Sequence, residues 1–208
     1  MKKRYLIPSL LLVAASLSSC GVKATECTYS EAKELYTKLK SNTTASASYV
    51  KTISATYQTY DTDGVVTNHK FDGDQTEGDY YYYIFEQREG EAASESLLYK
   101  KDGKYCLGSG EVVMESVAKI AANGYVKGLM TLVNAFITFP EESVAANYKF
   151  YTLSDGGLKY EYIMDGSSKE SLTINSDGLV TNWHSEINGS KSNYDITYNG
   201  KINKKSGL

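Results

Sequence analysis

Side chains that could carry chemistry are few in this 208-residue sequence, and most of them stand alone. The two histidines, His69 and His184, fall in no metal-ligand spacing, and no Cys-x-x-Cys or His-Glu-x-x-His pattern occurs. The sequence also lacks the Gly-x-Ser-x-Gly motif of serine hydrolases and the glycine-rich loops that bind phosphates. We therefore expect neither an enzyme nor a bound cofactor or metal, and we interpret each histidine as an ordinary strand side chain.

A short acidic stretch holds the remaining candidates for metal ligands. Calcium binds carboxylate oxygens of this kind, but the spacing lacks the full twelve-residue calcium loop. Acidic residues are also common turn formers, which is the interpretation we favour. The residues are Asp61, Asp63, Asp72, Asp74, Glu77 and Asp79.

Cys20 differs from the other candidates because of the residues before it. The chain opens with Met1-Lys2-Lys3-Arg4 and continues with a mostly apolar run over 5–15. A positive segment, an apolar segment and a small-residue cleavage zone are the layout of an export signal. The apolar run is well short of the roughly 20 residues that a membrane-spanning helix needs.

The segment Leu17-Ser18-Ser19-Cys20 resembles the lipobox of bacterial lipoproteins. The resemblance implies diacylglyceryl transfer to the Cys20 thiol and cleavage after Ser19. We therefore expect a signal peptide over 1–19, a lipidated tether over 20–27 and one domain over 28–208. The protein would be held by lipid at the extracytoplasmic face of a cell membrane. An ordinary signal with a coincidental cysteine is the alternative.

Composition restricts the partners of the exported chain. Without Lys2, Lys3 and Arg4, 19 basic side chains face 25 acidic ones, so the chain has no electrostatic footprint for nucleic acid. We expect a monomer whose partner is the membrane. The 19 tyrosines suit half-buried strand positions, where the ring packs and the hydroxyl reaches water.

The sequence allows two states for the further cysteines Cys27 and Cys106. Outside the cytoplasm they could form a disulfide that closes a long loop, which could contribute about 4 kcal/mol. Two unpaired thiols, one in the tether and one buried under a strand, are the alternative. We favour the unpaired state because Cys27 lies so near the anchor.

The periodicity of the domain predicts mainly antiparallel strands and a few helices. Thr28 and Glu31 match a capping box, and the apolar spacing behind them predicts a helix over 29–40, with a loop over 41–48. A central helical block should hold a helix that Asn123-Gly124 ends and a buried apolar helix over 125–139. Alternation and hairpin turns predict strands over 49–58, 65–71, 80–87, 94–100, 148–153, 158–164, 171–175, 179–187 and 193–198, and a short strand ending at 107.

This order of elements predicts an α+β fold. A single curved antiparallel sheet, a half-barrel, would wrap around the N-terminal helix and the central block. The segment from Leu172 to Thr181 and the final Ile196-Thr197-Tyr198 resemble the C-terminal hairpins of half-barrel lipoproteins of the outer-membrane lipoprotein carrier and LppX/LprG types. The resemblance implies an apolar cavity between sheet and helices that holds acyl chains.

Two apolar segments are candidates for the lining of such a cavity. The aromatic run over 80–85 could form a wall of it, although a central strand packed on both faces explains the run as well. The second segment is the apolar helix of the central block. The candidate residues are Tyr81, Tyr83, Phe85, Leu129, Leu132, Val133 and Phe136.

Two functions are compatible with these features. The first is a binding module that shelters a lipid or another apolar ligand at the membrane surface. The second is a structural or protein-interaction surface lipoprotein without a small-molecule ligand. An apolar pocket of several hundred Å³ between sheet and helices would favour the first.

Overall fold

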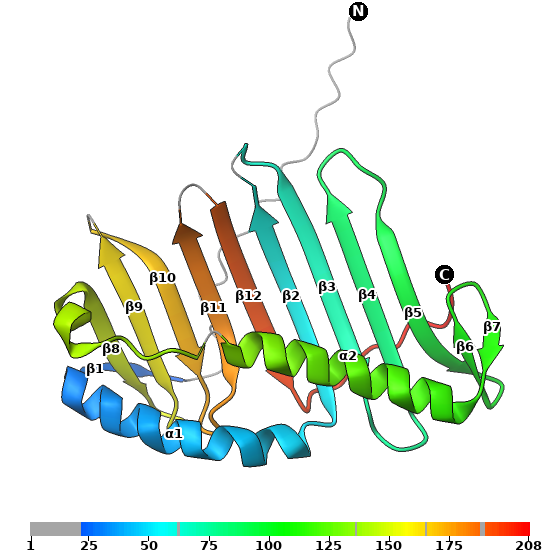
Figure 1. Ribbon diagram of the computed structural model, residues 1–208, viewed down its shortest axis with the longest axis horizontal. Coiled ribbons are helices and arrows are strands. Elements are labelled where there is room, and N and C mark those ends of the chain that lie inside the picture. The colour runs from blue at the N-terminus through cyan, green and yellow to red at the C-terminus, as the bar shows by residue number, and fades with distance from the viewer. Residues whose placement is uncertain (1–21, 62, 136, 165, 188–189) are drawn as a thin grey trace, which may run out of the picture.

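The computed structural model describes residues 22–61, 63–135, 137–164, 166–187 and 190–208, which form an α+β protein with one open, curved antiparallel sheet (Figure 1). This confirms the predicted fold class. Within these residues two α-helices, α1 (Tyr29–Tyr49) and α2 (Glu115–Ala135), and one 3₁₀ helix, η1 (Glu142–Asn147), accompany twelve strands. The strands are β1 (Ala24–Cys27), β2 (Thr52–Tyr60), β3 (Val66–Asp74), β4 (Tyr81–Arg88), β5 (Ser94–Lys101), β6 (Lys104–Leu107), β7 (Glu111–Val113), β8 (Tyr148–Leu153), β9 (Leu158–Met164), β10 (Ser167–Ile174), β11 (Val180–Ile187) and β12 (Ser190–Tyr198).

The strand order is β1-β8-β9-β10-β11-β12-β2-β3-β4-β5-β6-β7. The last strand, β12, lies in the middle and pairs with β11 on one side and β2 on the other. It therefore joins an N-terminal half of the sheet, β2–β7, to a C-terminal half.

Two hairpin turns share one local design. In the turn before β3, Asp61 Oδ1 accepts from the backbone N–H of Asp63 and Val65, and Gly64 has a φ of +79°. In the turn before β11, Asn175 Oδ1 accepts from Asp177 and Leu179, and Gly178 has a φ of +78°. A side-chain acceptor followed by glycine in the left-handed region closes such turns without strain.

Helix α1 begins at the predicted capping box but is longer than predicted. The Thr28 hydroxyl accepts from the Glu31 backbone, and the Glu31 carboxylate accepts from the Thr28 backbone. The helix continues to Tyr49 through the residues predicted as a loop. The hydroxyl of Thr37 donates to the Lys33 carbonyl four residues back, so this polar side chain is satisfied inside the helix.

Helix α2 is one helix, whereas the sequence predicted a stop at Asn123-Gly124. Its buried stripe, Ala118, Ala122, Val126, Leu129, Met130 and Val133, runs through that point without interruption. Packing of this stripe on the sheet overrides the helix-breaking tendency of glycine, which costs only about 1 kcal/mol. The packing is close: a Cβ on Gly73 of β3 would lie 2.8 Å from Val126 Cγ2.

The expected tether over 20–27 is wrong for its last residues. Ala24–Cys27 is an edge strand that pairs with β8, from Ala24 opposite Leu153 to Cys27 opposite Phe150. Lys23 is held as well, because its N–H donates to Ser154 Oγ and its carbonyl accepts from Ser154 N–H, both at 2.9 Å. The β-branched and small residues of this segment complete a sheet edge rather than remaining free.

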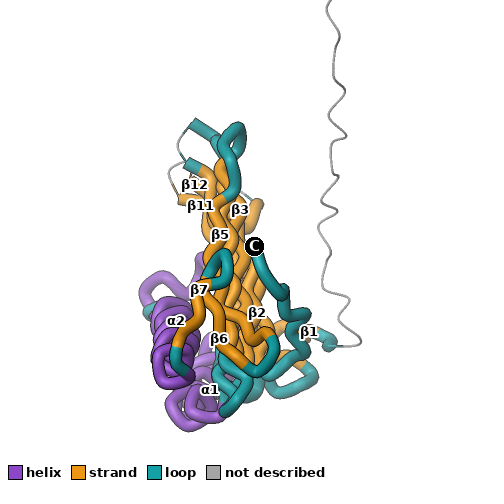
Figure 2. Tube along the Cα trace, turned by 90° about the vertical axis from the view of Figure 1, so that its right-hand side faces the viewer, coloured by secondary structure: helices purple, strands orange, loops and turns teal. Residues whose placement is uncertain are grey.

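Both α-helices lie on the same face of the sheet, which we call the helix face (Figure 2). The main core fills the space between them and the sheet, with apolar side chains from both halves of the sheet. A smaller cluster of Tyr81, Leu97, Tyr99 and Cys106 lies on the far face, where Ile202 of the C-terminal segment covers it. Lys204 and Lys205 hold that segment through ion pairs with Asp74 at 2.7 Å and Glu95 at 2.6 Å.

Candidate functional site

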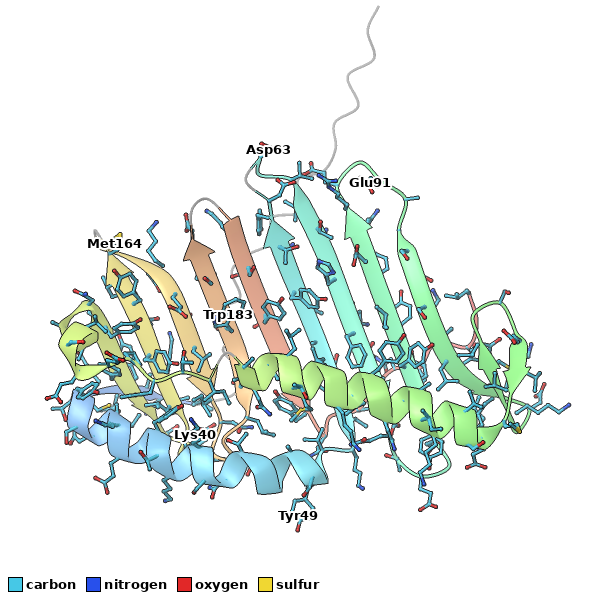
Figure 3. The ribbon with its side chains drawn as sticks, viewed as in Figure 1. Lys40, Tyr49, Asp63, Glu91, Met164 and Trp183 are labelled. Atoms are coloured by element: carbon cyan, nitrogen blue, oxygen red, sulfur yellow. The ribbon has the colours of Figure 1, made fainter. Side chains whose placement is uncertain are left out.

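A row of four rings crosses the middle of the helix face. Trp183 of β11 lies opposite Tyr194 of β12, which lies opposite Tyr57 of β2, and Tyr57 lies opposite His69 of β3. The Tyr57 ring stacks on His69 with centroids 4.2 Å apart and on Tyr194 with centroids 4.5 Å apart. Figure 3 labels Trp183 near the middle of the sheet. We call these residues the ring row.

The ring row ends at a histidine with two polar neighbours. His69 Nε2 lies 3.2 Å from Thr59 Oγ1, and its Nδ1 lies 3.4 Å from a carboxylate oxygen of Glu86. Burial lowers the pKa of His69, and the negative charge of Glu86 opposes this shift. Burial also raises the pKa of the Tyr57 hydroxyl. The row is therefore largely uncharged at neutral pH.

A cleft of about 490 Å³ opens between the end of α1 and the lower part of β11 and β12. Leu179 and Ile196 lie beneath its surface and are only 2% and 5% exposed, so polar groups make up most of the lining, together with the ring of Tyr198. The Tyr198 hydroxyl donates to the carbonyl of Val180, so the ring has a fixed orientation. The complete lining is Tyr49, Asn175, Asp177, Leu179, Thr181, Ile196, Thr197, Tyr198 and Asn199.

The wall and rim of the cleft are held by contacts with α1. The Thr43 hydroxyl donates to the Gly178 carbonyl at 2.9 Å, which ties the turn at 175–178 to the helix. A Cβ on Gly178 would collide with the Leu39 carbonyl, so only glycine allows this approach. Ile196 beneath the cleft surface and Tyr194 in the ring row are two residues apart on β12 and share one face of the sheet. The cleft and the ring row are thus neighbours on that face.

The three aromatic residues predicted to line a cavity lie on the wrong face for it. Tyr81 and Tyr83 belong to the far-face cluster, and Phe85 follows them at the same alternation. Hydrogen bonding to Glu95, together with a larger effect of burial, raises the pKa of Tyr83 to about 12. The run over 80–85 alternates between the two faces of the sheet, and Tyr80, Tyr82 and Ile84 are the residues that face the helices.

The candidates from the central block separate into three groups. Leu129 and Val133 belong to the buried stripe of α2 and contact the sheet as part of the main core. Leu132 is 45% exposed on the outer side of the helix and lines no space beneath it. Phe136 lies outside the described residues, as does Cys20, the predicted lipidation site.

The acidic stretch is divided between the two ends of β3. Asp61 pairs with Arg88 at 3.1 Å, whereas Asp72 pairs with Lys70 at 3.0 Å. Among the described residues no group of three or more His, Cys, Asp or Glu side chains could hold a metal ion. Cys27 and Cys106 are both free thiols.

The sequence reasoning missed the residues that do surround the cleft. Tyr194, Ile196 and Tyr198 alternate along the last strand, which is the available signal that they share one face. Alternation does not show which face of the sheet the helices cover. That depends on contacts such as Gly178 with Leu39, which join segments far apart in the chain.

Comparisons with known proteins add structural likeness alone. No family model and no curated protein matches the sequence. Eleven chains of solved structures match, among them one described as the crystal structure of MucB, which aligns at 13% identity with a TM-score of 0.26. The alignment covers 83% of this chain and 60% of the MucB chain. In the described part of the chain, neither helix has the length and apolar character needed to cross a membrane.

Proposed function

We propose that this protein is a lipid-anchored extracytoplasmic binding protein that holds an apolar ligand, such as an acyl chain, on the helix face of its half-barrel. The cleft of about 490 Å³ between α1 and the sheet carries this proposal. The export signal and the lipobox-like Leu17-Ser18-Ser19-Cys20 support the anchor.

The size and surface of the cleft suit an amphipathic ligand. Ligand pockets are typically about 300–1,000 Å³, mostly apolar and with a few polar groups that fix orientation. Here the rings of Tyr49 and Tyr198 offer apolar contact, whereas Asn175, Asp177 and Asn199 supply polar groups at the rim. Each methylene that leaves water for an apolar surface contributes about 0.8 kcal/mol, so affinity should rise with the length of the hydrocarbon that the cleft covers.

Fluorescence of Trp183, the one tryptophan of the chain, provides the test, because the ring row adjoins the cleft. Titration of the full chain with a lysophospholipid below its micellar concentration should give a saturable change. Thr181→Phe should fill the cleft and weaken binding at least ten-fold. Thr56→Phe is the matched control, since Thr56 is exposed on the far face of neighbouring β2. Equal affinity in both variants, or no saturable change in the native chain, contradicts the proposal.

A protein-interaction role is the second candidate, and the outer side of α2 favours it. Ile120 is 73% exposed there, and Met114 just before the helix is 71% exposed. Tyr125 and Leu132, 42% and 45% exposed, lie on the flank of the helix, where the Tyr125 ring contacts Tyr82 of the sheet. Exposed apolar side chains gathered on one element mark interaction surfaces. Ile120→Glu should disrupt such an interaction and leave lysophospholipid binding unchanged, which separates the two functions.

A further inference from the structure

We propose that the end of the sheet that carries α1 rests on the bilayer surface and that the cleft opens there, toward the membrane. This end, which we call the α1 end, consists of α1 and the turns at 154–157 and 175–178 (Figure 1). The orientation rests on the lipid anchor at Cys20 that is part of the proposed function.

The free part of the tether is very short. Backbone hydrogen bonding between Lys23 and Ser154 fixes the chain from Lys23 onward. Only residues 20–22 connect the lipidated cysteine to that point. Three residues reach at most about 11 Å in any conformation. The headgroup layer on one side of a bilayer is itself about 5–8 Å thick, so the domain cannot stand away from the membrane.

A chain of contacts connects the attachment point to the cleft. The tether is bound at Ser154, which begins the turn between β8 and β9. A Cβ on Gly156 of this turn would lie 3.6 Å from Ser176 Cβ in the next turn of the same end. Asn175 and Asp177 in that second turn form the rim of the cleft. The anchor and the cleft therefore lie at the same end of the sheet, one turn apart.

The two ends of the sheet differ in charge. Residues 23–51, which include α1, carry five lysines and three glutamates, and the two turns of the α1 end add Asp155 and Asp177, so this end is about neutral. At the opposite end the turns contain Asp63 and Glu91, and Figure 3 shows these two residues at the far end of the strands from Lys40 and Tyr49. An anionic bilayer repels acidic groups, so it disfavours contact at the end with Asp63 and Glu91 and not at the near-neutral α1 end.

Tyr49 is suited to the contact itself. Its side chain is 73% exposed at the end of α1 and also lines the cleft. Tyrosine is enriched where a protein meets the headgroup layer, because the ring is apolar and the hydroxyl is polar. A ligand that leaves the bilayer beside Tyr49 would reach the cleft without crossing bulk water.

Amine labelling of the full chain in vesicles tests the orientation. The protein is reconstituted into phosphatidylcholine vesicles and treated with a water-soluble acylating reagent, and labelling is read by peptide mass spectrometry. Lys38 and Lys40 on α1 should react at least three-fold less than in detergent solution. The exposed Lys119 and Lys127 of α2 serve as controls and should react equally in both conditions. Equal reactivity of both pairs in vesicles would overturn the orientation.

A longer tether tests the cause of the contact. Ten Gly/Ser residues inserted after Val22 add about 17 Å of reach and change no charge. In phosphatidylcholine this variant should regain the reactivity of Lys38 and Lys40. Protection that persists in the variant contradicts the role of the tether.

If Cys20 carries no lipid, the experiment gives a different result. Intact-mass measurement before labelling shows whether Cys20 carries diacylglyceryl. An unmodified cysteine refutes the lipid anchor of the proposed function, and the orientation with it. A modified cysteine with equally reactive lysine pairs refutes the orientation alone.

Discussion

Gly73 shows how one missing side chain sets the distance between helix and sheet. A Cβ there would lie 2.8 Å from Val126 Cγ2 and 2.9 Å from the Phe71 ring, closer than real contacts of this kind. Val126 is 1% exposed and stiff at χ1, so it has no room to rotate away. Glycine at this position therefore lets α2 pack against β3.

Gly73→Ala should lower the free energy of unfolding by about 1–3 kcal/mol, because overpacking strains a filled core. Gly124→Ala is the matched control on the outer side of α2, where nothing lies within 4 Å of the added carbon. That change should raise stability by about 0.5–1 kcal/mol. Urea unfolding followed by circular dichroism measures both; a neutral Gly73→Ala would show that the helix is not held this closely.

His69 should make stability depend on pH. Its pKa is lowered in the folded protein, chiefly by burial, so the unfolded chain binds its proton more readily. Stability due to this group is therefore present above the ordinary histidine pKa and is lost as the pH falls below it. The free energy of unfolding should decrease between pH 7.5 and 5.5, and His69→Asn should flatten the profile. A flat profile for the native chain would contradict the burial of the ring.

At the scale of the element, α1 depends on its first turn. The capping box satisfies two backbone N–H groups that otherwise have no partner in the helix. Thr28→Ala should cost about 1 kcal/mol of stability, which thermal unfolding measures as a lower midpoint. Thr37→Ala is the control, since its exposed hydroxyl only donates back within the helix. Equal losses in the two variants would mean that the cap has no special role.

The positions of most helices and strands were predictable from the sequence, whereas the side of each strand that faces the helices was not. The capping residues Thr28 and Glu31 located the start of α1, and the turn residues located most hairpins. The length of α1 and the continuity of α2 depend on tertiary packing, which overrides the loop-like composition after Lys40 and the Gly124 signal. The alternation of β4 is visible in the sequence, but which of its two sets of side chains faces the helices is not. That depends on tertiary contacts such as the C-terminal segment, which covers Tyr81 on the far face.

At the scale of the whole molecule, the lipid anchor proposed at Cys20 sets where the sheet acts. Replacing residues 1–20 by an export signal that is cleaved without lipidation should release the protein into the soluble fraction of fractionated cells, whereas the native protein should stay with membranes. Cys27→Ala is the matched control and should stay with the membranes, because Cys27 is a free thiol on β1. Retention of the variant without Cys20 on membranes would show that another surface holds it.

The position of β12 between the two halves of the sheet has a consequence for the order of folding. Synthesis delivers the chain from its N-terminus, yet β1 must wait for β8, and β2 must wait for β12, the last strand to emerge. Pairings of such long sequence separation form slowly, because closing the long loop costs conformational entropy before the contacts form. The sheet therefore stays incomplete until the final residues arrive, and during that interval its apolar strands are exposed to aggregation.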